Sequence, residues 1–452
     1  VMDETNIVSL GTGPLGGKGR GCAFINTLIY NLNFPDIIPD LNIRTPRTCI
    51  VGTDEFDIFM ERNSLHELVR GDHSYEEIRR IFSEADLSYN LEKKLKVLVK
   101  QLEGPLAIRS SSMLEDSTLQ PFSGIFDTYL VPNNDASAIR RFNQIAQCIK
   151  LVYASIYSSH SRSYFEVTNF NLEEEKMGVV VQEVVGEVHG NYFYPHVSGT
   201  AQSHNYYPVA HMEPEDGYAL AALGLGHYVV NGEKSYRFSP VYPNLEVNSP
   251  QKLYRDSQVD FYALDLNSSD ADFVNQGSEA NLVKLTISHA EKDGVLKHLA
   301  SVYDPENDRI EPGLSAVGPR ILNFANILKY DHVPLAKTIQ LILDVGKEAM
   351  GCPVEIEYAL DLNKAANEKP SFYLLQIKPM HGSGTGFSFD KEQLRQEDLV
   401  IYAEQSMGNG KITGVRDAVF VKLESFDRLR TKEIAAELEK MNREMKEAKQ
   451  EY

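Results

Sequence analysis

The chain has 452 residues, a formal net charge of −19 and a hydrophobic content of 42%. The negative charge argues against nonspecific binding to nucleic acid or anionic membranes, and no run of about 18 apolar residues indicates a membrane helix. The four cysteines lie far apart and support neither a zinc site nor a disulfide framework. Since no signal peptide is visible either, we expect a cytoplasmic protein of roughly two to four domains without nucleic-acid or membrane partners.

A glycine-rich segment follows the first expected strand, at residues 6–10, and precedes a stretch with helical periodicity. Residues 11–16 match the G-x-G-x-x-G pattern, which taken alone suggests a nicotinamide-dependent oxidoreductase. The glycines continue through Gly21, however, which delays the helix, and Lys18 lies among them where a dinucleotide turn needs no lysine. We predict a mobile loop at residues 16–19 that presents the Lys18 ammonium group to a ligand. The alternative is a plain surface turn with a solvated lysine.

Helices dominate most of the N-terminal region. A strand is expected near residues 48–51, followed by a helix that opens at Thr53 or Asp54. Residues 64–103 alternate charged and apolar positions at helical spacing, and residues 138–166 read as one long amphipathic helix.

A polar motif surrounds Arg109. A short apolar run delivers this arginine, which we place at the tip of a buried strand, and serines occupy positions 110–112. A guanidinium group offers fork-shaped donors to phosphate oxygens, and hydroxyls and the backbone of Gly124 can complete a phosphate cradle. The alternative is a structural ion pair between Arg109 and Glu115 or Asp116 in a serine-rich turn.

Strands dominate after about residue 176. They are expected at residues 177–185, 282–287, 354–362 and 371–377, the last two as an antiparallel pair. Residues 381–389 have the Gly/Ser content of a linker. The charged tail from residue 430 is helical without a stop signal, so we expect the chain to be a fragment of a longer enzyme.

The expected hairpin carries two carboxylates, a carboxamide and a cation. Glu355 and Glu357 stand at i and i+2 and share one face of a strand, as do Gln376 and Lys378 on the next strand. If the strands pair, these groups converge on one surface and offer the hard oxygen ligands that Mg²⁺ needs beside nucleotide phosphates. The alternative is the ordinary wet face of a half-exposed hairpin.

In chain order, four motifs resemble the nucleotide-binding domain of the phosphoenolpyruvate synthase and pyruvate phosphate dikinase family. They are GGKG at 16–19, AIRSSS…EDS…FSG at 107–124, ALGLGxxVVxGE at 222–233 and ExE…LLQIKP at 355–379. The resemblance implies an α/β (α+β) ATP-grasp fold of two lobes with mixed and antiparallel sheets. The N-terminal lobe would span 1–175 and the C-terminal lobe 176–380, with a linker and the start of a following region at 381–452.

The resemblance also implies roles for single residues. Lys18 would act on the nucleotide phosphates, and Arg109 would stabilise the transferring phosphoryl group. Glu357 and Gln376 would bind Mg²⁺. The remaining ATP-binding residues would be Gly16, Gly17, Gly19, Ser110, Gly124, Gln182, Glu183, Glu355 and Lys378, with Gln182 and Glu183 lining the adenine pocket.

The chain departs from the family in ways that bear on its activity. Family members pass phosphate from ATP to a histidine on a separate domain, and a barrel domain then passes it to pyruvate. No Thr-Ser-His-Ala-like motif is present, the flanks of His381 do not fit, and no second set of strand–helix repeats follows. Glu355 replaces a usual Asp, and His227 a frequent Glu. We therefore expect an ATP- and Mg²⁺-dependent phosphotransferase domain whose acceptor lies outside this chain. The second hypothesis is a nucleotide-sensing module without catalysis.

Overall fold

The computed structural model describes residues 7–113, 124–168, 171–268, 271–362 and 368–380, together with Lys422, Phe426 and residues 430–447. The chain forms two compact units, Val1–His381 and Gly382–Tyr452. The described part of the second unit contains helix α15 (Thr431–Glu447), which agrees with the expected helical tail. The expected linker and His381 lie outside the described residues. Among the described helices, none combines the length and hydrophobicity of a membrane span.

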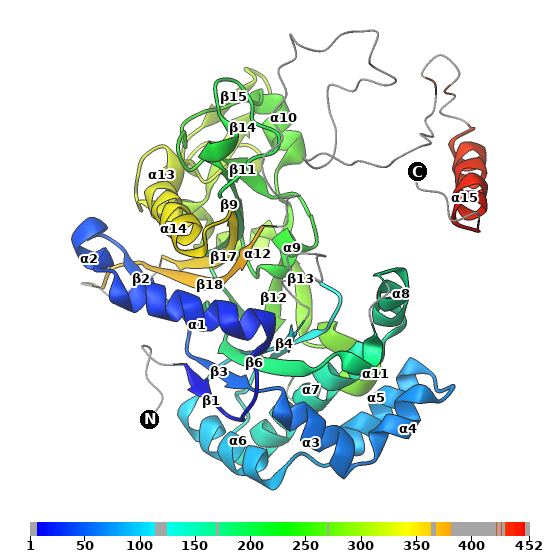
Figure 1. Cartoon of the computed structure of the whole chain (residues 1–452). Coiled ribbons are helices and arrows are strands. Elements are labelled where there is room, and N and C mark those ends of the chain that lie inside the picture. Colours follow the sequence, from blue (N-terminus) through cyan, green and yellow to red (C-terminus); the bar gives the residue numbers. More distant parts are fainter. Residues whose placement is uncertain are drawn as a thin grey trace. The chain divides into compact units, whose positions relative to one another are not determined.

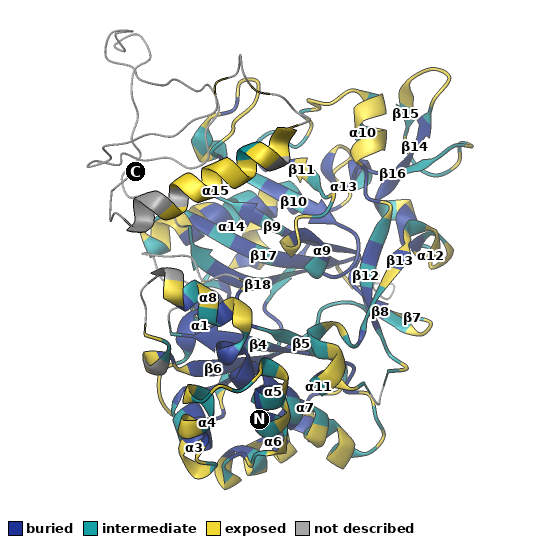
Figure 2. Ribbon diagram, turned by 90° about the vertical axis from the view of Figure 1, so that its right-hand side faces the viewer, coloured by how far each residue is buried: buried dark blue, intermediate teal, exposed yellow. Residues whose placement is uncertain are grey.

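The first sheet has five strands in the order β1-β3-β6-β4-β5 (Figure 1). The strands are β1 (Val8–Ser9), β3 (Thr48–Val51), β6 (Met177–Glu183), β4 (Leu106–Ser112) and β5 (Thr128–Val131). β1 is parallel to β3, and the other neighbours are antiparallel. The central strands β6 and β4 are buried (Figure 2). Helices that pack against this sheet cover them.

Helices from the N-terminal half share one hydrophobic core with the first sheet. They are α3 (Asp54–Arg62), α4 (Leu65–Arg70), α5 (Tyr75–Glu84), α6 (Tyr89–Gln101) and α7 (Ala138–Ala154). The expectation of one helix over 138–166 is wrong. A 3₁₀ turn (Ser155–Tyr157) follows α7, and Ser158 is extended before α8 (Ser159–Thr168). The Ser158 hydroxyl accepts a hydrogen bond from Ser161 N–H at 3.1 Å, so this serine caps a new helix instead of continuing the old one.

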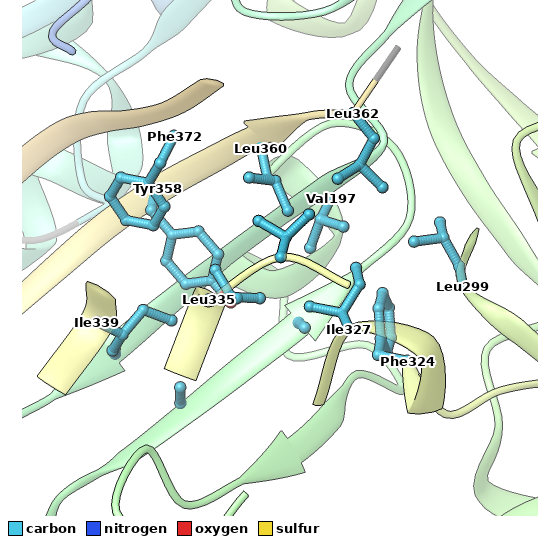
Figure 3. Close-up of a cluster of buried hydrophobic side chains, with 14 of the residues drawn as sticks. Val197, Leu299, Phe324, Ile327, Leu335, Ile339, Tyr358, Leu360, Leu362 and Phe372 are labelled. Carbon is cyan, nitrogen blue, oxygen red and sulfur yellow. The ribbon is translucent and has the colours of Figure 1, made fainter. Parts of the chain in front are cut away.

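The second sheet has six strands in the order β11-β10-β9-β17-β18-β2. They are β11 (Tyr236–Phe238), β10 (Tyr218–Ala222), β9 (Val197–Gln202), β17 (Val354–Asp361), β18 (Ser371–Pro379) and β2 (Asn42–Arg44). β17 and β18 pair antiparallel, which confirms the predicted hairpin. α13 (Ala325–Leu328) and α14 (Leu335–Met350) add apolar side chains to the core of this sheet, part of which Figure 3 shows.

Two smaller sheets complete the first unit. One has the order β13-β12-β8-β7, with β13 (Leu282–Thr286), β12 (Asp260–Asp265), β8 (Tyr192–Tyr194) and β7 (Glu187–His189). The other has the order β15-β14-β16, with β15 (Arg309–Glu311), β14 (Ala300–Asp304) and β16 (Arg320–Leu322). Short helices connect strands of the last three sheets: α9 (His227–Val230), α10 (Pro250–Asp256), α11 (Phe273–Gln276) and α12 (Ile287–Lys292). The mixed α/β fold class with mixed and antiparallel sheets is confirmed.

Sheet membership does not follow the expected lobe ranges of 1–175 and 176–380. β6 lies beyond residue 175, yet it pairs with β3 and β4 and belongs to the first sheet. β2 lies in the N-terminal range, yet it pairs with β18 in the second sheet. β6 joins the first sheet because it is buried along nearly its whole length and needs a neighbouring strand on both sides.

Helix α1 (Gly16–Asn31) lies between the two large sheets and contacts β4, β6 and β18 (Figure 1). Residues 16–19 form its first turn, so the prediction of a mobile loop is wrong. A Cβ on Gly16, where φ is +73°, would lie 1.8 Å from the carbonyl oxygen of Ser111, and one on Gly21 would lie 2.6 Å from that of Ile377. The glycines therefore allow the helix to approach both strands closely, rather than to move. Since α1 begins at Gly16, the glycines do not delay the helix, and that argument against a dinucleotide-binding turn no longer holds.

Candidate functional site

A cavity lies where α1, the first sheet and the second sheet meet. It is partly open to solvent and is lined by residues of both sheets. One end is polar and contains Lys18, Arg109, Gln182 and Glu357. The other end is largely apolar, and its wall includes Leu130, Val184, Leu225, Val230 and Leu282. The cavity thus presents both charged and apolar walls to a ligand.

Lys18 enters the polar end from the first turn of α1. Its ammonium group donates to the Ser110 hydroxyl at 3.3 Å. The neighbouring Ser111 hydroxyl accepts from Gly19 N–H at 2.9 Å and donates to the Leu15 carbonyl at 2.7 Å. The serines therefore join the start of α1 to β4, which fixes the backbone that carries Lys18.

Arg109 lies in the middle of β4, not at its tip as predicted. The strand continues because the serines at 110–112 are buried and pair with β6. From this position, Nη2 of Arg109 donates to Glu357 Oε2 and to Gln376 Oε1, both at 2.8 Å, and Nη1 donates to Gln182 Oε1 at 3.3 Å. One guanidinium group thus connects the two sheets across the cavity. Glu115 and Asp116, the alternative partners, lie outside the described residues.

The hairpin brings its polar side chains together as the alternating pattern predicted. Glu355 stands opposite Lys378, and Glu357 stands opposite Gln376. Lys378 Nζ lies 3.0 Å from Glu355 Oε1, and Gln202 Nε2 donates to Glu355 Oε2 at 2.6 Å. The register shifts directly after Glu357, at a bulge between Glu357 and Tyr358. Bulges re-aim side chains, and this one occurs where the strand faces Arg109.

Electrostatics keep Glu357 ionised. Burial raises the pKa of Glu357, but Arg109, Lys378 and Lys18 outweigh burial and hold the pKa below its ordinary value of 4.5. A carboxylate that stays charged at neutral pH is a suitable oxygen ligand for a divalent cation. The side chain is only 21% exposed, so solvent screens this charge weakly.

Gln182 and Glu183 line the cavity at the end of β6, but their side chains already have partners. Gln182 Nε2 donates to Thr48 Oγ1 at 3.2 Å and to the Leu375 carbonyl at 3.4 Å. Glu183 accepts from Nε of Arg47 at 2.9 Å and also from its Nη2. These side chains shape the wall of the cavity. Because they are engaged with other residues, mainly the backbone groups of Gln182 and Glu183 are available to a ligand.

Leu225, His227 and Val230 lie in the motif at 222–233, but the rest of the apolar wall carried no recognisable signal in the sequence. The apolar wall comes from four segments that are far apart in the chain, so no local periodicity marks it. His227 lines the same region, with Nε2 2.9 Å from Asn231 Nδ2 and 3.7 Å from Glu279. Burial lowers the pKa of His227, although Glu279 acts in the opposite direction. Gly124 also lines the cavity, with a φ of +78°.

Residues 14–399 match the family described as "Pyruvate phosphate dikinase, AMP/ATP-binding domain". Among curated proteins, the chain is similar to a phosphoenolpyruvate synthase of Aeropyrum pernix, with 27% identity over 179 residues. It is also similar to a phosphoenolpyruvate synthase of Deinococcus radiodurans, with 26% identity over 238 residues. A third relative is the uncharacterized phosphotransferase YvkC of Bacillus subtilis, with 28% identity over 190 residues.

These matches cover only part of each protein. They include 39%, 48% and 41% of this chain, and 19%, 27% and 20% of the respective relatives. The chain therefore spans about a fifth to a quarter of the length of the curated relatives it matches.

Proposed function

Because this chain belongs to the pyruvate phosphate dikinase AMP/ATP-binding domain family, we propose that its cavity binds Mg²⁺ and ATP in an ATP-grasp site for phosphoryl transfer. The phosphoryl acceptor would be a histidine outside this chain, since family members carry that histidine on a domain separate from the ATP-binding domain. The observation that carries the proposal is the position of Arg109. This guanidinium group touches both the carboxylate and the carboxamide of the hairpin while it lines the cavity beside Lys18.

The polar end of the cavity would hold the phosphates. Phosphoryl transfer is catalysed mainly by positioning and by neutralising charge, and Lys18 and Arg109 supply two positive charges there. Gly16, Gly17 and Gly19 would bring the N-terminus of α1 near the phosphates, where the helix dipole favours anions. Ser110, which binds Lys18, would hold that ammonium group in place, and Gly124 would allow close approach of the backbone.

The hairpin would hold Mg²⁺ through Glu357 and Gln376. A carboxylate and a carboxamide oxygen are hard ligands, which fit this ion, and Glu355 and Lys378 complete the charged surface. When bound, Mg²⁺ would neutralise phosphate charge. Arg109 now uses Glu357 and Gln376 as acceptors, so phosphate oxygens would replace one or both of them when ATP arrives.

The apolar end would hold the adenine base. The base is flat and has little charge, so burial between aliphatic side chains such as Val184, Leu225 and Leu282 is favourable. Gln182 and Glu183 would border it with backbone groups, since their side chains are engaged with other residues.

Calorimetry on the full chain tests the proposal. We expect saturable binding of ATP that strengthens when Mg²⁺ is added, and weaker binding to Lys18→Met. Transfer is tested separately by incubating the chain with [γ- and β-³²P]ATP and a phosphohistidine-domain protein from a relative. Absence of ATP binding would refute the proposed site. Binding without transfer to any such acceptor would favour the sensing module.

A further inference from the structure

A second cluster of ionisable side chains lies away from the polar end of the cavity. Asp361 is the last residue of β17, Glu187 is the first residue of β7, and His196 lies between β8 and β9. One ligand atom from each of these three residues lies within 4.8 Å of the other two. Three separate segments thus direct a carboxylate, a second carboxylate and an imidazole toward one point.

The cluster is buried at the border of an apolar core, with the rings of His189 and His298 also near His196. His196 has no exposed surface and Asp361 is 5% exposed. Their chain neighbours Val197, Leu360 and Leu362 belong to the hydrophobic cluster that Figure 3 shows. Polar and charged groups are costly to bury unless their hydrogen-bonding capacity is used.

His196 has a nitrogen whose capacity is not used. Its Nδ1 accepts from Leu362 N–H at 3.4 Å and lies 3.5 Å from Asp361 Oδ1, beyond ordinary hydrogen-bond distance. Its Nε2 is buried and has no hydrogen-bond partner among the described residues. His196 thus keeps one buried ring nitrogen without a partner among the described residues, and one of its ring nitrogens is clustered with two carboxylates. Such donors suit a cation that binds both nitrogen and oxygen.

From this geometry we propose that Glu187, His196 and Asp361 form a binding site for a divalent transition-metal ion of the Zn²⁺ type. Imidazole favours Zn²⁺ over Mg²⁺ or Ca²⁺, and carboxylates are also common zinc ligands. Two carboxylates held this close repel each other, and a divalent cation between them removes the repulsion. Zn²⁺ binds four ligands in structural sites. His189 is a source for the fourth, because its Nε2 is also buried without a partner among the described residues and its ring centre lies 6.1 Å from that of His196.

The ion would connect two sheets. Glu187 belongs to the four-stranded sheet and Asp361 to the six-stranded sheet, so shared coordination holds them together. Pro195, directly before His196, lines the nucleotide cavity. The metal would therefore stiffen one wall of the cavity without taking part in the chemistry. It is separate from the proposed Mg²⁺ site, because Glu357 lies four residues from Asp361 along β17, roughly 13 Å in an extended strand.

The test uses the full chain, freed of metal by a chelator and then titrated with Zn²⁺ in excess Mg²⁺. We expect one Zn²⁺ per chain by calorimetry and by metal analysis after gel filtration, and a rise in melting temperature. His196→Gln and Glu187→Gln should each weaken Zn²⁺ binding about tenfold or more, since even partners of metal ligands have effects of this size. Glu187 is only partly buried, so its variant is expected to fold even if the His196 variant does not.

Two matched variants control for other binding modes. His211→Gln removes an exposed histidine that contacts Tyr242, and it should leave Zn²⁺ binding unchanged. Glu357→Gln should also leave it unchanged, which separates this site from the ATP site. Absence of stoichiometric Zn²⁺ binding to the unaltered chain would overturn the proposal, and so would equal binding by the Glu187 variant. Loss of Zn²⁺ binding in Glu357→Gln would instead place the Zn²⁺ at Glu357, in the proposed Mg²⁺ site, and would also overturn the proposal.

Discussion

The two ends of β17 carry carboxylates in different electrostatic settings. At one end, Glu355 and Glu357 lie 3.0 and 2.8 Å from cationic groups of Lys378 and Arg109. At the other end, Asp361 lies 3.5 Å from an imidazole, with a second carboxylate close by. A carboxylate beside a guanidinium or ammonium group stays ionised, and that group can later be shared with an anionic ligand. A carboxylate beside an imidazole and another carboxylate is better suited to a transition-metal ion.

The largest expected effect comes from removing the cation that contacts Glu357. Arg109→Ala should weaken Mg·ATP binding about 10- to 100-fold, because charge-assisted hydrogen bonds to phosphate are lost. Any phosphoryl transfer should fall on the order of 10³-fold. Calorimetry and the ³²P transfer assay measure these changes.

A matched control for this prediction exists in the same chain. Arg320 pairs with Glu291, also at 2.8 Å and also partly buried, but away from the cavity. Arg320→Ala should leave ATP binding unchanged. Arg109→Ala also leaves the Glu357 charge without its guanidinium partner, so the double variant with Glu357→Gln should regain stability without regaining ATP binding. Equal loss of ATP binding in both arginine variants would contradict the assignment of Arg109.

The next largest effect concerns the helix that brings Lys18 to the charged end of β17. Gly16→Ala should lower the free energy of unfolding by about 3 kcal/mol or more, because it combines a positive φ with a clash against the backbone of Ser111. Gly232 has a similar φ of +71°, but a Cβ there meets no atom within 4 Å. Gly232→Ala should therefore cost only about 1 kcal/mol. Urea unfolding of both variants separates the clash from the backbone strain, and equal costs would show that close packing of α1 does not matter.

A pH series gives a smaller effect and tests the charge of Glu357 directly. Its pKa is held below 4.5 in the folded protein, so ionisation of Glu357 stabilises the fold above that pH. This stabilisation is lost as the pH falls through the folded-state pKa. The melting temperature of the unaltered chain should exceed that of Glu357→Gln at neutral pH, and the difference should shrink below pH 4.5. A difference that stays constant with pH would mean that the carboxylate charge is not what stabilises this end of β17.

Local patterns in the sequence predicted well the half of β17 that carries Glu355 and Glu357. The alternating polar residues at 355 and 357 and at 376 and 378 converge on one surface if two strands close in sequence pair. β17 and β18 do pair, with Glu355 opposite Lys378 and Glu357 opposite Gln376. The start of α1 was not predictable in the same way. Glycine lowers helix propensity, and only the nearby strands β4 and β18 explain why a helix at Gly16 is favoured.

Contacts over long sequence distances escaped sequence reasoning. Arg109 finds two of its acceptors, Glu357 and Gln376, on another sheet, and the apolar wall of the cavity is assembled from separate segments. The same holds for Glu187, His196 and Asp361. Cysteine spacing gave no reason to expect zinc, and a carboxylate–histidine set spread over three strands or strand ends has no fixed spacing to recognise.

The smallest expected effect is a change at Lys378 that keeps its charge. Lys378→Arg should alter Mg·ATP affinity by less than about threefold, since the guanidinium group can still contact Glu355 and preserves the positive charge beside Glu357. Lys378→Met removes that charge and should weaken binding more, because Glu355 then lacks its ammonium partner and repels phosphate. Calorimetry at two salt concentrations distinguishes the variants, as a charge effect diminishes with ionic strength. If Lys378→Arg and Lys378→Met weakened Mg·ATP binding equally, the shape of the lysine side chain would matter at this position. Charge alone would then not explain the role of Lys378.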